Sequence, residues 1–377
     1  MNKNPLKALL AQGQSVWLDY IRRDLIRTGG LKRLVEEEGI RGVTSNPTIF
    51  EKSIADSTDY DDALRALLAK DPKTDIGNLY ERLAIEDIQM AADVLRTTYD
   101  ETGGGDGYVS LEVSPHLAHN TQATIDEAKR LRAAVDRPNV MIKVPATREG
   151  VPAVEELIAE GVNINVTLMF SMSHYEAVAG AYIRGLGRCA DPAKVASVAS
   201  FFVSRVDTMV DRALESLATA QAQAKTLLGK IAIANSKMVY HRFLQIFQSE
   251  GFVALRQRNA RVQRPLWAST GTKNPAYSDV LYVENLIGAE TVNTLPLETL
   301  HAFKDHGKVA GETVRDSLDD AAAALGRLKA LGLNIDTITE KLQQDGVAAF
   351  ASSFDQLMAA LEKKRAAIIG TEAGRSI

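Results

Sequence analysis

The stretch Val140-Met141-Ile142-Lys143-Val144-Pro145 places one lysine inside an otherwise apolar run. Such a run of apolar and β-branched residues is typical of a buried strand. An unpaired ammonium is costly to bury, so Lys143 indicates either a structural ion pair or chemistry. Burial also favours the neutral form of an amine, which is the form that attacks a carbonyl to give a Schiff base. Lys143 is therefore the first candidate for a functional residue.

Short strand-like segments alternate with amphipathic helical segments along the rest of the chain. The eight predicted strands are Ser15–Tyr20, Gly42–Asn46, Tyr108–Val113, Val140–Val144, Ile164–Leu168, Val195–Val203, Pro265–Ser269 and Thr291–Leu295. Alternation of this kind favours parallel pairing, and eight units predict a closed (β/α)8 barrel of the TIM type. A doubly wound open sheet is the alternative fold.

The chain has more residues than such a barrel needs. It contains 377 residues, whereas a barrel of this class typically takes about 250. We expect one elaborated domain over residues 1–377, with a helical insertion between strands two and three at 51–106 and a C-terminal helical extension at 297–377. Within the extension, the periodicity predicts long helices over Val309–Ala330 and Thr337–Ala366.

Composition limits the classes of partner. Lys plus Arg is 44 and Asp plus Glu is 48, a formal net charge of −4, which gives no support for nucleic acid or an anionic membrane as a main partner. The single cysteine, Cys189, excludes an intramolecular disulfide and fits a reducing compartment. No apolar run reaches membrane-spanning length and the first residues lack a signal-peptide core, so a cytoplasmic location is expected. His116 and His119 lack the spacing of a zinc motif, so no metal is expected.

Polar residues recur on one face of the predicted strands, near their carboxyl ends. Because successive side chains alternate between the two faces of a strand, the residues that share a face can be read from the sequence. They are Asp19 in the first strand, Asn46 in the second, Glu112 in the third, Lys143 in the fourth, Asn165 and Thr167 in the fifth, and Ser200 and Phe202 in the sixth. In a (β/α)8 barrel these ends converge on the active-site mouth. The recurrence over six strands therefore predicts a site for carbonyl chemistry around Lys143.

Two roles are open for the carboxylates. Asp19 and Glu112 either neutralise a buried Lys143 or act as general acids and bases for Schiff-base chemistry. The neutral groups of Asn46, Asn165, Thr167 and Ser200 suit sugar hydroxyls or a held water, with internal hydrogen bonding as the structural alternative.

Two cations follow predicted strands. Arg205 lies at the start of the helix after strand six, where a guanidinium suits a phosphate dianion; an ion pair with Asp207 or another surface ion pair is the alternative. Lys273 lies in the loop after strand seven, and phosphate sites of barrels often use the loops after strands seven and eight.

With these residues placed, the chain resembles the transaldolase family over most of its length. The matching segments are Trp17-Leu18-Asp19, Thr44-Ser45-Asn46-Pro47, Leu111-Glu112-Val113, Met141-Ile142-Lys143, Asn163–Ser171 and Ser200–Arg205, and Ala268–Pro275 is similar to the larger bacterial subgroup. The resemblance implies a (β/α)8 relative of the class I aldolases. Such an enzyme moves a dihydroxyacetone unit from sedoheptulose 7-phosphate to glyceraldehyde 3-phosphate, giving erythrose 4-phosphate and fructose 6-phosphate in the pentose phosphate pathway.

The resemblance also implies a role for each candidate residue. Lys143 would form the Schiff base, and Asp19 would take the proton of the C4 hydroxyl. Glu112 would shuttle protons together with a water that Thr167 holds. The remaining residues would bind the substrate: Asn46, Asn165 and Ser200 would orient its hydroxyls, Phe202 would line the pocket, and Arg205 would bind the phosphate. Many relatives have a second phosphate-binding Arg after strand seven. Here Lys273 would take its place, without the bidentate fork of Arg. No metal or organic cofactor is implied, since the iminium itself is the electron sink.

Two other functions compete with this interpretation. One is a related Schiff-base aldolase that releases free dihydroxyacetone, and the other is a non-catalytic sugar-phosphate-binding barrel. The sequence does not give the oligomeric state. It also does not decide whether the additional helices cap the barrel or form a subunit interface.

Overall fold

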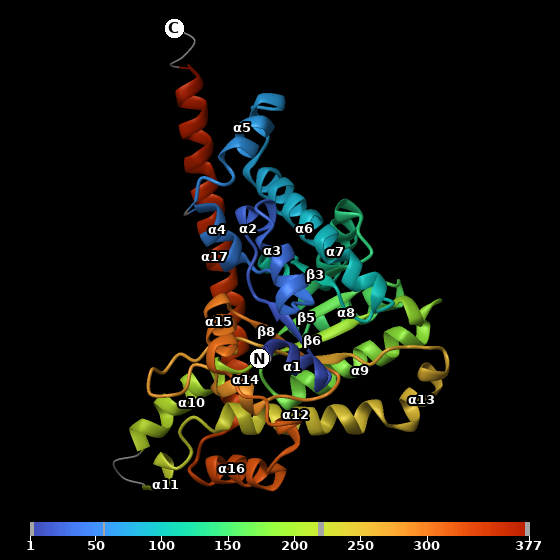
Figure 1. Cartoon of the computed structure of the whole chain (residues 1–377), viewed down its shortest axis with the longest axis vertical. Helices are drawn as coiled ribbons and strands as arrows, with labels where there is room; N and C mark the ends of the chain where they lie inside the picture. Colours follow the sequence, from blue (N-terminus) through green and yellow to red (C-terminus); the bar gives the residue numbers. More distant parts are fainter. Residues whose placement is uncertain (1–3, 56, 218–221, 374–377) are drawn as a thin grey trace.

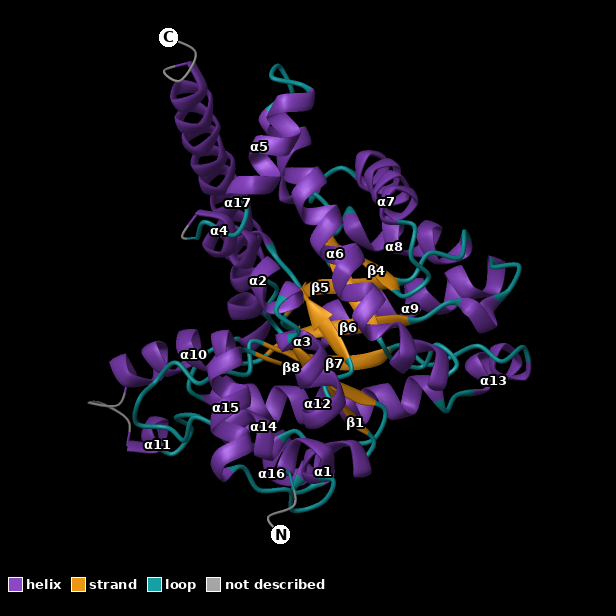
Figure 2. Ribbon diagram, turned by 45° about the horizontal axis from the view of Figure 1, so that its top comes forward, coloured by secondary structure: helices purple, strands orange, loops and turns teal. Residues whose placement is uncertain are grey.

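The chain folds around a closed parallel barrel (Figures 1 and 2). The computed structural model describes residues 4–55, 57–217 and 222–373, the last three of them by backbone alone. The strands are β1 (Gln14–Leu18), β2 (Gly42–Thr44), β3 (Tyr108–Glu112), β4 (Val140–Pro145), β5 (Ile164–Met169), β6 (Ser197–Phe202), β7 (Arg264–Ala268) and β8 (Thr291–Leu295). Each pairs with its neighbour in chain order, and β1 pairs with β8. The predicted barrel is confirmed, and the open sheet is wrong because the sheet closes.

The register of β3, β4 and β5 places the side chains of Glu112, Lys143 and Asn165 at the same level of the barrel. Glu112 on β3 lies opposite Lys143 on β4, and Lys143 lies opposite Asn165 on β5. Side chains of laterally paired residues in parallel strands point to the same face. The register therefore brings the carboxylate, the amine and the amide together on the inner face.

The fifth strand carries a bulge at its carboxyl end. The pairing of β5 with β6 shifts between Val166 and Met169, and Leu168 has a φ of 59°. A left-handed conformation at a residue with a side chain costs roughly 1–2 kcal/mol. Two hydrogen bonds offset this cost, because the buried Gln343 amide donates to the carbonyls of Leu168 at 3.0 Å and Ala146 at 2.9 Å. The bulge follows Thr167 directly, and bulges of this kind re-aim side chains beside active sites.

Helices occupy the connections between strands. They are α1 (Pro5–Ala11), α2 (Arg23–Arg27), α3 (Gly30–Arg33), α4 (Pro47–Ala55), α5 (Asp61–Lys70), α6 (Ile76–Glu101), α7 (Thr121–Val135), α8 (Gly150–Ala159), α9 (Met172–Arg188), α10 (Ser204–Leu217), α11 (Ala222–Lys225), α12 (Ile231–Phe247), α13 (Glu250–Gln257), α14 (Leu281–Asn285), α15 (Leu297–His306), α16 (Leu318–Ala330) and α17 (Ile335–Ala373). A π-helical turn spans Leu34–Glu38, and 3-10 turns span Pro115–Leu117, Pro192–Lys194 and Thr313–Arg315.

The C-terminal helices differ in part from the prediction. The helix predicted over Val309–Ala330 is wrong in its first half, since α16 begins only at Leu318. Gly311 and Ser317 both have positive φ, which a continuous right-handed helix does not allow. The helix predicted over Thr337–Ala366 is present and longer, as α17.

The last helix, α17, lies over one end of the barrel. It packs against α4 and also contacts α6, α10 and β5. Figure 1 shows it in red, passing α4 and projecting beyond α5 towards the C-terminus. A fully buried ion pair between Arg23 Nε and Asp87 Oδ1 at 2.7 Å joins α2 to α6, which α17 also contacts. The segments after β2 and after β8 thus pack against the barrel and against each other.

Candidate active site

A cavity of about 270 Å³ opens at the carboxyl ends of the strands. It is lined by Asp19, Thr44, Asn46, Thr48, Ile49, Lys52, Lys143, Thr167, Ser200, Phe202, Arg205, Ala268, Ser269, Lys273, Thr294, Pro296 and Phe350. We name it the sugar cavity, after the substrate class that the family resemblance implies. Every predicted site residue lines it except Glu112 and Asn165, which hydrogen bond or pair with residues that do.

Lys143 lies at the floor of the sugar cavity and is 4% exposed. Its Nζ atom is 2.9 Å from Glu112 Oε2 and donates to the carbonyl oxygen of Ser45, also at 2.9 Å. The side chains of Lys143 and Glu112 are 5% and 6% exposed, so bulk water screens their interaction little. The amine is therefore held in one position, with a carboxyl group within proton-transfer distance.

Burial dominates the electrostatics of Glu112. It raises the pKa of the carboxyl group, and the nearby charge of Lys143 opposes that shift. A carboxyl group with a raised pKa takes up a proton more readily than an ordinary one, and it can then donate that proton to an oxygen that is leaving as water. Glu112 is therefore suited to general acid catalysis beside the amine.

Asp19 is a second carboxyl group in the cavity, held by a hydroxyl. Thr44 Oγ1 donates to Asp19 Oδ1 at 2.6 Å, and the same hydroxyl is 2.7 Å from that of Thr294. Burial raises the pKa of Asp19, while the Thr44 hydrogen bond and the charges of Lys143, Arg205 and Lys273 lower it. Asp19 is thus placed to act as a base that lies close to positive charge.

Two consecutive hydrogen bonds hold the side chain of Ser200 in place. Ser200 Oγ donates to Asn165 Oδ1 at 2.6 Å, and Asn165 Nδ2 donates to Ser110 Oγ at 3.0 Å. Asn165 is fully buried and does not line the cavity. Its amide positions Ser200, while its predicted contact with a substrate hydroxyl stays a prediction.

Two polar side chains keep a hydrogen-bonding group free. Thr167 Oγ1 is buried, lines the cavity and has no hydrogen-bond partner within the described part of the chain. Asn46 Oδ1 accepts from the backbone N–H of Ile49 at 2.9 Å in the first turn of α4, which leaves the amide nitrogen for a ligand. Buried polar groups normally have partners, so the Thr167 hydroxyl indicates a place for water or a substrate hydroxyl.

Positive charge surrounds the mouth of the cavity. The Arg205 guanidinium lies 5.2 Å from the Phe202 ring and 5.9 Å from the Phe350 ring, and among the described residues it pairs with no carboxylate. Its predicted alternative partner, Asp207, instead accepts from Tyr282 at 2.9 Å and from the N–H of Ala232 at 2.7 Å. The ion pair between Arg205 and Asp207 is therefore wrong, and the guanidinium is available to an anion.

Several lining residues were not predicted as site residues from the sequence, and two of them, Lys52 and Phe350, bring a charge and an aromatic ring to the cavity. Lys52, on α4, adds a third cation beside Arg205 and Lys273. The only signal for it was a lysine in the helix that follows Asn46. Phe350 comes from α17, and no pattern in the sequence connects that helix to the mouth.

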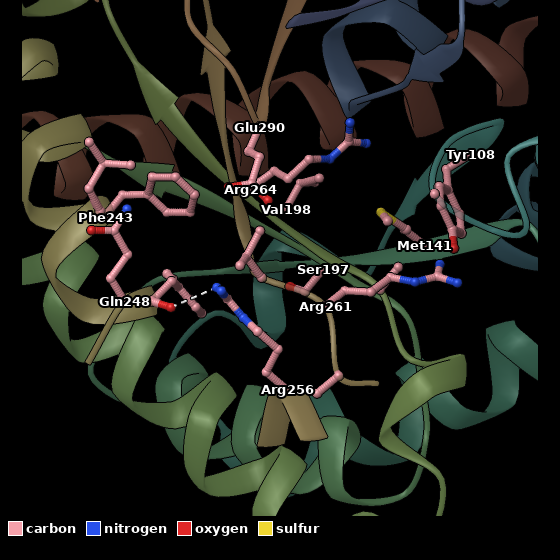
Figure 3. Close-up of a pocket in the computed structure, with 16 residues that line it drawn as sticks. Tyr108, Met141, Ser197, Val198, Phe243, Gln248, Arg256, Arg261, Arg264 and Glu290 are labelled. Carbon is pink, nitrogen blue, oxygen red and sulfur yellow. Dashed lines mark hydrogen bonds between the residues drawn. The ribbon is translucent and has the colours of Figure 1, made fainter. Parts of the chain in front are cut away.

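A larger cavity, of about 440 Å³, lies at the opposite end of the barrel (Figure 3). Its three arginines bind groups of the protein itself: Arg256 donates to the Phe247 carbonyl, Arg261 to the carbonyls of Gly103 and Gly104, and Arg264 to Ser15 and Asp106. The amino-terminal end of such barrels normally serves stability. The chemistry therefore belongs to the smaller cavity.

Two other kinds of feature are absent from the described residues. No group of three or more His, Cys, Asp or Glu side chains is arranged to hold a metal ion. No helix in those ranges has the length and apolar character that crossing a membrane requires.

Comparison with known proteins gives a consistent result. The family described as Transaldolase/Fructose-6-phosphate aldolase matches residues 16–361. A protein of Frankia alni named Transaldolase is 46% identical over 365 residues, which are 96% of this chain and 97% of the relative. Proteins with the same name from Thiobacillus denitrificans and Acidothermus cellulolyticus are 46% and 45% identical over 94% and 96% of this chain, and 99% and 96% of their own lengths.

Proposed function

The chain belongs to the transaldolase and fructose-6-phosphate aldolase family, as its sequence motifs predicted, and we propose that it is a transaldolase. It transfers a dihydroxyacetone unit from sedoheptulose 7-phosphate to glyceraldehyde 3-phosphate, giving erythrose 4-phosphate and fructose 6-phosphate, in the cytoplasm. The observation that carries this proposal is the contact of 2.9 Å between the buried Lys143 amine and Glu112 at the floor of the sugar cavity.

The first step is Schiff-base formation on Lys143. Only an uncharged amine is nucleophilic, and proton transfer across the contact with Glu112 provides one. The amine adds to C2 of the ketose, and one proton of the added nitrogen passes to the former carbonyl oxygen to give a carbinolamine. The Glu112 carboxyl then protonates the C2 hydroxyl, the C–O bond breaks with its electron pair, and water leaves as the iminium forms. The unpartnered hydroxyl of Thr167 is suited to hold that water.

Cleavage of the C3–C4 bond is assigned to Asp19. Its carboxylate removes the proton of the C4 hydroxyl, the bond electrons pass to the iminium nitrogen, and an aldehyde leaves. Burial raises the pKa of Asp19, and the hydrogen bond from Thr44 and the nearby cations limit that rise, which favours the ionised form that this step needs. Addition of the acceptor aldehyde reverses the step, and hydrolysis frees Lys143.

The remaining side chains account for substrate recognition. Ser200 and Asn46 offer a hydroxyl and an amide to the dihydroxyacetone portion, and the Phe202 ring lines the wall beside them. Arg205, Lys273 and Lys52 provide positive charge for the phosphate at the far end of the sugar. Arg205 offers a planar fork, whereas the two lysines act as point charges.

Reductive trapping tests the proposal. Borohydride added with fructose 6-phosphate should leave one covalent adduct, which peptide mapping places on Lys143. Lys237 is the internal control, because it is another largely buried lysine, 8% exposed, that does not line the sugar cavity. Labelling of Lys237 instead, or of no lysine, contradicts the assignment.

Acceptor dependence separates transfer from simple cleavage. Product formation that requires an acceptor aldehyde supports a transaldolase. Steady release of free dihydroxyacetone without acceptor would instead support the related aldolase activity, and absence of both would support a non-catalytic barrel.

A further inference from the structure

A separate cavity lies behind the carboxyl group of Glu112. It measures about 150 Å³ and is lined by Gly77, Tyr80, Glu81, Ala84, Ile85, Leu111, Glu112, Ser114, Glu127, Leu131 and Phe354. We name it the outer cavity. None of these described residues lines the sugar cavity. The two cavities are thus distinct spaces at the same end of the barrel.

The pair of Lys143 and Glu112 forms the boundary between the two cavities. Lys143 lines the sugar cavity and Glu112 lines the outer cavity, with 2.9 Å between their charged atoms. The helix α17 also contributes to both cavities: Phe350 lines the sugar cavity, and Phe354, one turn further along the helix, lines the outer cavity. Glu112 therefore belongs to the chemistry on one side and adjoins a different space on the other.

The walls of the outer cavity suit water. Glu81, Glu127 and the Tyr80 phenol bring polar atoms from α6 and α7. The backbone N–H of Ser114 donates to Glu127 at 3.4 Å, and Arg130 pairs with Glu81 at the surface side. Burial raises the pKa of Tyr80, and the charge of Glu112 raises it further, so phenol and carboxyl interact. These polar groups interrupt an otherwise apolar lining, and the space has room for several waters, each of which takes about 30 Å³ in the liquid.

The reaction creates a need for such a space, and this step depends on the proposed function. One water leaves C2 when the iminium forms, and one water adds when the product is released. Between these events the sugar and then the acceptor fill the sugar cavity. Water that had to pass through the sugar mouth would compete with the acceptor for the same path.

We propose that the outer cavity is the water compartment of the Schiff-base step. The water released at C2 is first held at Thr167, then passes Glu112 into this space and exchanges there with bulk solvent, and the water of hydrolysis returns by the same path. Sugar phosphates use the other mouth. Atoms balance because the oxygen lost from the donor ketose and the oxygen gained by the product ketose both travel as water.

Oxygen labelling tests this separation. Fructose 6-phosphate carrying ¹⁸O at C2 is given to the enzyme with erythrose 4-phosphate in ordinary water, and mass spectrometry measures the label retained at C2 of sedoheptulose 7-phosphate. Exchange without enzyme is subtracted. Ala84→Leu and Leu131→Phe fill the outer cavity from α6 and from α7. Each variant should raise the retained fraction several-fold over the wild type, because the released water lacks an outlet and adds back.

Matched variants exclude a general disturbance of the fold. Ile85→Leu also changes a residue of the outer cavity but conserves volume, and Phe354→Leu enlarges the space; neither should raise retention. If one filling variant does not fold, the other decides. If Ala84→Leu or Leu131→Phe folds and its product retains no more ¹⁸O than that of the wild type, the proposal is wrong, provided that borohydride still labels Lys143 in that variant. Absence of that adduct in the wild type would instead refute the Schiff-base function itself.

Discussion

Lys143 Nζ lies 6.0 Å from the centre of the Phe350 ring, although Phe350 belongs to the last helix of the chain. The same ring lies 5.9 Å from the guanidinium carbon of Arg205. One aromatic side chain of α17 thus faces both the proposed nucleophile, Lys143, and the proposed phosphate-binding residue, Arg205.

The first prediction concerns this aromatic cover. Phe350→Ala removes a partly desolvated cation–π partner of Arg205 and opens the site to solvent. A contact of this kind contributes about 1–2 kcal/mol, so KM for fructose 6-phosphate should rise roughly tenfold. Release of free dihydroxyacetone should also increase relative to transfer, because water reaches the intermediate. Steady-state kinetics with and without acceptor measure both effects, and Phe350→Trp should preserve the cover.

The second prediction concerns the hydroxyl that holds Asp19. Thr44→Val removes a hydrogen bond that lowers the pKa of Asp19, so that pKa rises further above its ordinary value. Asp19 acts as a base only when ionised, and the acidic limb of the profile of kcat/KM against pH should therefore move to higher pH. On the acidic side of that limb, kcat/KM should fall roughly tenfold relative to the wild type. Thr44→Ser restores a hydroxyl and should restore the profile; an unshifted limb in Thr44→Val would remove Asp19 from this role.

The third prediction concerns phosphate recognition. Arg205→Lys keeps the charge but loses the bidentate fork, and the loss of a charge-assisted hydrogen bond should raise KM for phosphorylated donors roughly 10- to 100-fold. Unphosphorylated fructose should be affected little. Arg212, exposed on the same helix and absent from the sugar cavity, offers the control Arg212→Lys. Equal effects on both donors would assign Arg205 to structure instead.

The fourth prediction concerns the proposed nucleophile. Lys143→Met should reduce turnover to background, while Lys237→Met should not. The variant also leaves the Glu112 carboxyl buried without its partner, which raises the folded-state pKa of Glu112 further. When the pKa of a carboxyl group is higher in the folded state than in the unfolded state, the group contributes most to the free energy of unfolding at low pH. That contribution is lost as the pH rises. Thermal melts should therefore show a deficit of about 3 kcal/mol at neutral pH that shrinks towards pH 5.

The fifth prediction concerns the attachment of α17. Gln343→Leu leaves the carbonyls of Ala146 and Leu168 without their donor, and should lower the free energy of unfolding by about 2 kcal/mol. Gln344→Leu changes the exposed neighbour on the same helix and should have little effect. Chemical denaturation of both variants gives the comparison. A stability loss of the same size in both would show that the two hydrogen bonds contribute nothing specific.

Much of the barrel could be predicted because its signals are local. Period-two alternation identified the strands and the shared face of Asp19, Glu112 and Lys143. The register then placed Glu112 opposite Lys143, as the convergence of strand ends required. These features depend on the sequence within each strand and on a regular fold.

Other features depend on tertiary packing and had no local signal. Phe350 reaches the mouth only because α17 packs against α4, and the outer cavity exists only where α6, α7 and α17 meet. The break before α16 depended on positive φ at Gly311 and Ser317. The domain limits at 51–106 and 297–377 and the roles of the individual site residues stay predictions.

The pair of carbonyls held by Gln343 has a consequence for biosynthesis. A nascent chain that has just completed β8 already has every barrel strand, and with them Lys143, Glu112 and Asp19. It still lacks the segment that supplies Gln343 and Phe350. An intermediate in which β8 has left the ribosomal exit tunnel but α17 has not should accordingly fold its strands yet fail to retain dihydroxyacetone, so that catalytic competence appears only when α17 has emerged.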